Sequence, residues 1–226
     1  MKNKTLQARY SGQGAKNYDA RRESSVRYKN EEAAFAKFFE EVKPRSVIDC
    51  PLGTGRWLPF YQNIEGSIIG VDLSVDMLDQ AKAKAKDLNL QNVTMISGSV
   101  LDFEFCQYSE VAPDLLVCTR FLNWVNESMM RAAIANLSSS GAKWAIVGAS
   151  VRPLDISLVR GMLMRSRLYI ENLIRKKQDE ALQYVHDESC VNSVMEVNSW
   201  EIVHKVHIFS NSTRINYFWL LRRRAA

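Results

Sequence analysis

The sequence predicts an α/β fold in which helices cover both faces of a mostly parallel, seven-stranded sheet that ends in an antiparallel hairpin. Between residues 46 and 150, short apolar runs rich in β-branched residues alternate with amphipathic segments. These runs are apolar on both faces, as expected of parallel strands buried between helices. The last two strand-like runs are separated only by "NSTR", a turn so short that they must pair antiparallel.

The first elements of the chain are a polar segment and a helix. Residues 1–29 are polar and are expected to form a covering segment, which leaves residues 30–226 as the domain proper. Asn30 favours a helix N-cap, and Pro44 follows the last apolar position of the segment. A helix is therefore predicted to begin at Asn30, with Phe35, Phe38, Phe39 and Val42 on its apolar face.

Five parallel strands are predicted next. They cover residues 46–50, 67–73, 92–97, 114–119 and 143–150. The intervening helices are expected to begin near Gly55, at the N-cap Ser74 and at the N-cap Asn126. Each helical crossover then makes the next strand run in the same direction as the last. The carboxyl ends of these strands therefore lie at one edge of the sheet.

The two hairpin strands have different patterns. Residues 199–208 alternate, and place Trp200, Ile202, Val206 and Ile208 on one face, as in a half-exposed edge strand. Residues 215–221 are apolar on both faces and are predicted to lie inside the sheet.

Composition excludes several classes of protein. The 226 residues are 46% hydrophobic and 24% charged, and no apolar run approaches the ~20 residues that span a bilayer. We therefore expect no membrane partner. The N-terminal residues lack the apolar core of a secretory signal, and the four cysteines have no disulfide-like spacing, so a cytoplasmic location is predicted. A net charge of +5 permits an anionic substrate or a nucleic acid. Oligomeric state does not follow from the sequence.

Positive charge is concentrated in one segment, Arg152 to Lys177. It contains seven basic residues and two acids within a predicted substrate-side insertion, residues 151–187. Arg160 and Arg167 lie seven positions apart and share a face of a continuous helix. Either this face is simply solvated, or its arginines select an anionic acceptor by bidentate pairing.

The stretch "VIDCPLGTGRWLPF", residues 47–60, joins a carboxylate to a glycine turn. Gly53 and Gly55 allow close approach of a ligand to the backbone, but Leu58 stands where a dinucleotide-binding loop has its third glycine. Asp49 would repel a phosphate and attract an ammonium group. Asp72, at the end of the next strand, suits the two hydroxyls of a ribose. A ligand with an ammonium group and a ribose but no phosphate matches S-adenosylmethionine better than NAD or ATP.

Four motifs together resemble the class I, Rossmann-like S-adenosylmethionine-dependent methyltransferases. They are "VIDCPLGTGR", "GVDLSVDML", "VTMISGSVLDF" and "PDLLVCTRFLNWV", in the order and spacing of that family. The closing "EIVHKVHIF" and "INYFWLLRR" are similar to the family's reversed last strands. The resemblance covers roughly residues 40–222 and implies the cofactor rather than the acceptor.

The resemblance implies a set of cofactor-binding residues. It assigns the methionine part to the glycine loop, the ribose to Asp72, the adenine to residues after the second and third strands, and the far side to the backbone of Thr119. The full set is Asp49, Pro51, Gly53, Thr54, Gly55, Asp72, Leu73, Met77, Ser99, Val100, Asp102 and Thr119. Pro51 replaces a usual glycine, and Ser99 stands where an acid is common, a role that Asp102 could fill.

The catalytic residue is not named by the sequence, because the sulfonium already activates the methyl group and many such reactions need no base. Candidates are Arg120 at the carboxyl end of the fourth strand, His186, and Tyr18 in the covering segment. His186 is expected more often to be a solvated loop histidine than a base. His204 and His207 lie three apart on a strand and would face opposite sides, so we expect no metal site there.

The predicted function is methyl transfer from S-adenosylmethionine to a small-molecule acceptor. Alternatives on the same fold are an RNA methyltransferase, an enzyme that cleaves the cofactor, and a non-catalytic S-adenosylmethionine-binding protein. Two patterns of DNA methyltransferases are missing, because Thr119 to Leu122 does not match the amino-methyltransferase motif and no cysteine follows a proline.

Overall fold

The protein is described by a computed structural model covering residues 25–107, 112–152, 157–177 and 182–225. The polar segment that was expected to cover the domain, with Tyr18, lies outside these residues apart from its last part. No helix among the described residues is both long and apolar enough to cross a membrane.

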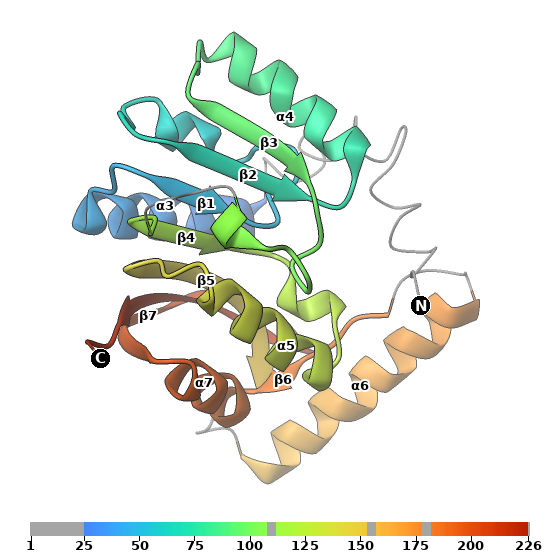
Figure 1. The fold of residues 1–226 in the computed structure, drawn as a ribbon. Helices are drawn as coiled ribbons and strands as arrows, with labels where there is room; N and C mark the ends of the chain where they lie inside the picture. The colour runs from blue at the N-terminus through green and yellow to red at the C-terminus, as the bar shows by residue number, and fades with distance from the viewer. Residues whose placement is uncertain (1–24, 108–111, 153–156, 178–181, 226) are drawn as a thin grey trace.

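The sheet has the order β3-β2-β1-β4-β5-β8-β7 (Figure 1). Its first five strands are parallel, and β8 is antiparallel to both β5 and β7. The predicted fold class is thereby confirmed, with the hairpin's second strand on the inside. The strands are β1 Val47–Asp49, β2 Ile68–Asp72, β3 Val93–Ser97, β4 Leu115–Cys118, β5 Trp144–Arg152, β7 Trp200–Ser210 and β8 Ile215–Arg223.

One short strand was not predicted. The two-residue β6, His186–Asp187, pairs in parallel with the end of β5. Two residues are too few to show the alternating or apolar pattern from which a strand is recognised.

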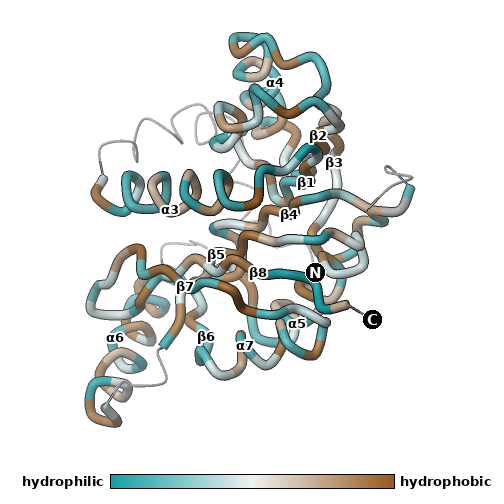
Figure 2. Tube along the Cα trace, turned by 90° about the vertical axis from the view of Figure 1, so that its left-hand side faces the viewer, coloured by the Kyte–Doolittle hydropathy of each residue, from teal (hydrophilic) through white to brown (hydrophobic). Residues whose placement is uncertain are grey.

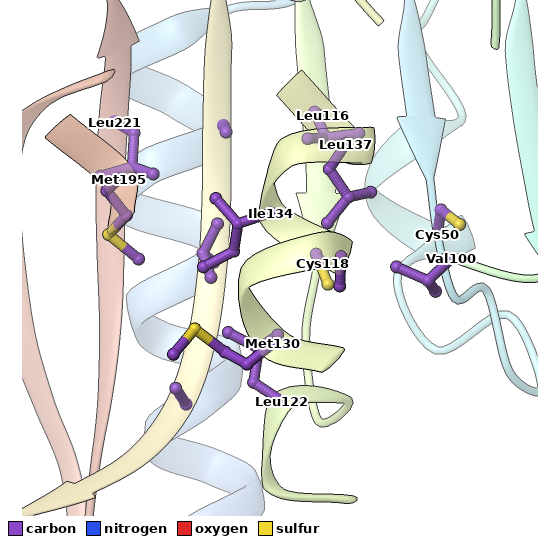
Figure 3. Packing of buried hydrophobic residues seen from close by; sticks show 14 of the residues in the cluster. Cys50, Val100, Leu116, Cys118, Leu122, Met130, Ile134, Leu137, Met195 and Leu221 are labelled. Carbon is purple, nitrogen blue, oxygen red and sulfur yellow. The ribbon is translucent and has the colours of Figure 1, made fainter. Parts of the chain in front are cut away.

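Helices cover both faces of the sheet (Figure 2). They are α3 Val26–Val42, α4 Val75–Asp87, α5 Glu127–Ser138, α6 Leu158–Lys177 and α7 Glu188–Val197. On one face, α5 and α7 enclose a core cluster that includes Met130, Ile134 and Met195 (Figure 3). On the other face, α3, α4 and the loop after β1 enclose a second cluster with Phe35 and Phe38. Ser74 and Asn126 cap α4 and α5 as predicted.

The first helix begins earlier than predicted. Its N-cap is Ser25, whose hydroxyl accepts a hydrogen bond from the amide of Tyr28. Asn30 is therefore inside α3, and its side-chain amide donates to the carbonyl of Ile208 at 2.8 Å. A long-range hydrogen bond thus replaces the capping role, which local sequence could not reveal.

The helix expected near Gly55 is also absent from the structure. Residues 50–57 form turns, and only the 3₁₀ segment η1 Leu58–Tyr61 follows. The amide of Leu58 bonds to the carbonyl of Gly55, three residues back, and Pro59 has no amide to continue an α-helix. The loop is therefore compact against the sheet.

The predicted single apolar face of β7 is wrong. Register shifts interrupt the strand between Ile202 and His204 and again between His207 and Phe209. Trp200 and Ile202 accordingly join the cluster under α5 and α7, whereas Val206 and Ile208 join the cluster under α3. A bulge inserts one residue and so exchanges the two faces of the strand.

Candidate functional site

The loop after β1 is held across the carboxyl edge of the sheet. The amide of Cys50 donates to the carbonyl of Val117 in β4 at 2.9 Å, and that of Leu52 donates to Val71 in β2 at 2.8 Å. Pro51 lies between these two anchors, and Thr54 is buried further along the loop. The loop therefore spans from β2 to β4 above the end of β1.

Asp49 ends β1 and is fully buried. The hydroxyl of Tyr61 donates to its Oδ2 at 3.0 Å, whereas its Oδ1 has no hydrogen-bond partner among the described residues. Burial raises the pKa of this carboxyl well above its ordinary value, and the nearby charge of Asp72 raises it further, although the bond from Tyr61 opposes them. A buried acceptor without a partner is costly, so this position suits a cationic ligand.

Asp72 ends β2 and fastens the glycine loop to the next helix. Its Oδ2 accepts from the amide of Gly53 at 2.8 Å, and its Oδ1 accepts from the amide of Ser74 at 2.9 Å. Burial raises the pKa of Asp72, although these backbone bonds pull it down. Each carboxylate oxygen has a second lone pair, so Asp72 can still accept hydroxyl groups.

The two loop glycines have left-handed backbones for which side chains are unsuited. Gly53 has φ 60°, and a Cβ placed there would meet nothing within 4 Å, so this side of the loop is open. Gly55 has φ 71°, and a Cβ there would lie 2.4 Å from Cδ1 of Leu58. Leu58 thus packs over Gly55 where a dinucleotide-binding loop would keep a third glycine.

The residues expected around an adenine differ in exposure. Met77 and Val100 are buried, whereas Leu73 is 63% exposed at the turn after β2. The hydroxyl of Ser99 accepts from the amide of Leu101 at 3.1 Å, and Asp102 is exposed in the same turn. On the far side of the loop, the hydroxyl of Thr119 accepts from the indole of Trp57 at 3.0 Å.

A buried carboxylate, Glu31 of α3, gathers three arginines at the same edge of the sheet. Its Oε2 accepts from Arg56, which follows the glycine loop, and from Arg120, which follows β4, with the Arg120 Nε at 2.8 Å. Its Oε1 accepts from Nε of Arg27 at 2.8 Å. Burial alone would raise the pKa of Glu31, but Arg120, Arg27 and Arg56 together hold it below its ordinary value.

Sequence reasoning missed this cluster. It did not consider Glu31, Arg27 or Arg56 as site residues. Arg120 was a candidate only for its position; its backbone is left-handed at φ 59°, and its guanidinium bonds to Glu31 of α3. No local pattern signals a contact between residues 25 to 89 positions apart.

A small pocket of about 10 Å³ lies beside the cluster. Its lining includes Arg27, Glu31 and Arg120, together with Asn123, the middle of β5 and the start of β8, where Asn216 lies. The Nδ2 of Asn216 donates to Ser150 at 2.6 Å, while its Oδ1 has no partner among the described residues. The lining of the pocket therefore includes two guanidinium groups, one carboxylate and a buried acceptor.

The remaining candidates occupy other positions. His186 is buried, and its Nε2 lies 2.8 Å from the carbonyl of Leu122, so the expected solvated loop position is wrong. Burial lowers the pKa of His186 and favours the neutral ring, with the Nε2 proton donated to that carbonyl. Arg160 and Arg167 are exposed on α6, and other residues line the pocket.

The opposite orientation of the two strand histidines is confirmed. His204 stacks on Phe38 and contacts Glu41 at 3.1 Å, whereas His207 contacts the ring of Tyr217. Among the residues that the structure describes, no group of three or more His, Cys, Asp or Glu could hold a metal ion.

Comparison with known proteins identifies the fold. Residues 47–141 match the model of the methyltransferase domain family. Magnesium protoporphyrin IX methyltransferase from Synechocystis PCC 6803, solved with S-adenosylhomocysteine, superposes with a TM-score of 0.73 at 11% identity, over 98% of this chain and 99% of that one. An S-adenosylmethionine-dependent methyltransferase from Clostridium acetobutylicum gives 0.65 at 13% identity, over 93% and 98%.

A curated relative is similar over part of its length. The 23S rRNA (uracil(747)-C(5))-methyltransferase of Shewanella amazonensis is 24% identical over 133 residues, which are 57% of this chain and 33% of that protein. The match therefore spans about a third of the relative. Residues 47–141 thus match a methyltransferase domain, and the chain as a whole has the fold of the solved methyltransferases.

Proposed function

We propose that this methyltransferase transfers the methyl group of S-adenosylmethionine to a small-molecule acceptor that carries an anionic group. The observation that carries the acceptor part is the buried cluster in which three arginines share one carboxylate, Glu31. Three guanidinium groups therefore gather beside the pocket around a single carboxylate. An anionic group on the acceptor would pair with such guanidinium groups.

The chain's own residues fit the cofactor. The unpartnered Oδ1 of Asp49 is suited to the ammonium group, and the open side of Gly53 leaves room for the methionine part. Asp72 would accept the ribose hydroxyls, with Leu73, Met77, Ser99, Val100 and Asp102 toward the adenine and Thr119 on the far side. When bound, S-adenosylmethionine supplies a methyl group already activated by its sulfonium, so the protein need only align the acceptor and exclude water.

Arg27 and Arg120 would hold the acceptor. Arg27 keeps 32% of its side chain exposed and Arg120 16%, so both are partly accessible, and both line the small pocket. The planar guanidinium pairs with a carboxylate through two parallel hydrogen bonds, which fixes orientation as well as position. Arg120 is thus proposed as an acceptor-binding residue rather than as a base.

We propose a structural role for His186. Its Nε2 proton is engaged by Leu122, at the start of the 3₁₀ segment η3 Leu122–Trp124. This hydrogen bond fixes the turn that follows Arg120, so His186 would position that turn without exchanging protons with the acceptor.

RNA is the alternative acceptor, suggested by the name of the partial relative. Methylation of a pyrimidine ring carbon commonly requires a thiolate that first adds to the ring. Burial raises the pKa of each of the three described thiols, Cys50, Cys118 and Cys190, which favours the unreactive thiol form. This argues against a cysteine-dependent reaction at uracil C5 through these residues.

A cytoplasmic location remains our proposal. Cys50, Cys118 and Cys190 are free, as in proteins of reducing compartments.

Removing the ribose acceptor is expected to weaken cofactor binding. Asp72→Ala should reduce the affinity for S-adenosylmethionine by about 1.5–3 kcal/mol, the range for losing a charged hydrogen-bond acceptor. Isothermal calorimetry on the folded variant measures this loss, with Asp76→Ala at the exposed start of α4 as the control. Unchanged affinity in a folded Asp72→Ala variant would end the assignment.

The acceptor is tested by transfer of a labelled methyl group into a metabolite extract and, separately, into total RNA. We expect labelled small molecules that an anion exchanger retains. Label in RNA alone would overturn the acceptor class. Tight cofactor binding without any transfer would instead favour a non-catalytic protein, and release of cofactor fragments without transfer would favour cleavage.

Arg27 is then tested with the labelled acceptor. Arg27→Gln is expected to raise the acceptor's KM about tenfold or more while the Kd for S-adenosylmethionine stays constant, because this arginine lies on the acceptor side of the site. Arg131→Gln, which also removes an ion-paired arginine but on the exposed side of α5, is the matched control. The same acceptor KM in Arg27→Gln and in Arg131→Gln would contradict the proposed anion site.

A further inference from the structure

The helix α6, Leu158–Lys177, exposes an unusually large apolar surface. Figure 1 shows it at the lower right, set apart from the sheet. Met164 is its one buried side chain. Eight large apolar side chains are 43–87% exposed, namely Leu158, Val159, Met162, Leu163, Tyr169, Ile170, Leu173 and Ile174.

These eight side chains lie on one face of the helix, with the exposed Ser166 at its centre. Positions 158, 162, 169 and 173 make one row along the helix, and positions 159, 163, 170 and 174 make the adjacent row. At 3.6 residues per turn the two rows cover about 160° of the circumference. Scattered exposed apolar residues are ordinary, but a contiguous face of this width marks a binding surface.

Contacts on the other side of α6 turn this face outward. Glu171 pairs with Arg214 at 3.0 Å, and Arg165 approaches Asp187 to 3.7 Å. The side chain of Asn172 exchanges two hydrogen bonds with the backbone of Gln183, at 2.8 and 2.9 Å. The helix is therefore attached through its polar side, and the apolar face points away from the domain.

Basic residues border the apolar face. On the helical wheel, Arg160 and Arg167 lie along one border and Arg165 along the other, and all three are exposed. Lys176 and Lys177 add two charges at the carboxyl end, also exposed. With Arg175, the helix has six basic residues against a single acid, Glu171, which is already paired with Arg214.

Charge decides between the possible occupants of this face. A second copy would bring two strongly basic helices together, with no unpaired acid on α6 to compensate them. The first 24 residues of the chain have six basic residues and two acids, so they carry the same sign. An anionic lipid surface instead matches both features, because it accepts the apolar face and attracts its basic borders.

We infer that α6 docks this protein on the surface of membranes that contain anionic lipids. The helix lies in the plane of the interface, with its apolar face among the acyl chains and its arginines at the headgroups. This revises the expectation of no membrane partner, which rested on the lack of a spanning segment. It does not depend on the identity of the methyl acceptor.

Flotation of the whole protein with vesicles of phosphatidylcholine, with and without phosphatidylglycerol, tests the inference. We expect binding to the anionic vesicles that falls with added salt, and weak binding to the neutral ones. Met162→Gln with Leu173→Gln should reduce binding to anionic vesicles about tenfold or more. Arg160→Gln with Arg167→Gln should reduce it about thirtyfold.

Matched controls distinguish an effect of α6 itself from the effect of removing any exposed apolar residue or charge. Val197→Gln removes an exposed apolar residue from α7, and Lys37→Gln with Lys86→Gln removes two exposed charges from α3 and α4. Both controls should float like the unchanged protein. Failure to float with anionic vesicles would overturn the inference, as would equal binding to neutral vesicles. A dimer that Met162→Gln with Leu173→Gln dissociates, without vesicle binding, would assign the face to a second copy.

Discussion

Replacement of Glu31 by glutamine is expected to destabilise the fold by about 3–5 kcal/mol, the range for removing one partner from a buried ion pair. The carboxylate is fully buried and receives hydrogen bonds from three arginines. Glutamine removes the negative charge that the three guanidinium groups share, and its amide nitrogen cannot accept a hydrogen bond. Urea unfolding at neutral pH measures the loss, with Glu32→Gln, an exposed neighbour on α3, as the control.

The same carboxylate predicts a pH dependence. Its pKa in the fold is lowered from an ordinary value of 4.5, so it contributes stability that is present above that value and lost as the pH falls through the folded pKa. The difference in free energy of unfolding between the unchanged protein and Glu31→Gln should therefore shrink below about pH 4.5. A difference that stays constant down to acid pH would mean that the carboxylate charge is not what holds the cluster.

Replacement of Asp49 by asparagine is expected to weaken cofactor binding by about 3 kcal/mol, roughly a hundredfold in Kd, because a buried ammonium would lose its counter-charge. S-adenosylmethionine and S-adenosylhomocysteine should be affected about equally, since both carry the ammonium group. Calorimetry with the two ligands measures this. Selective loss of S-adenosylmethionine would mean that Asp49 interacts with the sulfonium instead.

In the ligand-free protein, the same substitution of Asp49 is expected to increase stability. Burial raises the pKa of Asp49 above the 3.8 of an unfolded chain. Its contribution to stability is thus fully present below pH 3.8 and is lost as the pH rises toward the raised value. Asp49→Asn removes this penalty, so the ligand-free variant should be more stable at neutral pH, by about 1 kcal/mol. A less stable variant would contradict the proposed cost of the buried charge.

The fold was predictable because its signals are local. Apolar runs marked each long strand, Ser74 and Asn126 marked two helix starts, and the short turn before Ile215 required antiparallel pairing. Where the prediction was wrong, a distant partner had changed a local preference. Asn30 hydrogen-bonds to β7 instead of capping α3, and a bulge after Ile202 exchanges the faces of β7.

The candidate site was predictable in part for the same reason. Asp49, the loop glycines and Asp72 occupy the ends of adjacent strands, so their proximity follows from sheet topology alone. Glu31 and Arg56 come from segments 25 positions apart and meet only because α3 packs against the loop after β1. The exposure of the apolar face of α6 also could not be predicted from the sequence. The same apolar residues would be expected if that face were packed against the domain.

The position of β8 has a consequence for how the chain folds as it is synthesised. This strand, Ile215–Arg223, emerges from the ribosome after the other seven, yet it lies between β5 and β7. Until it is available, one edge of β5 has no antiparallel neighbour, and β7 has no partner in the sheet. Unpaired strand edges are sites of wrong association, so the edges of β5 and β7 have to be protected until β8 has been synthesised. Local helices can form early, but the sheet is completed only when β8 joins it.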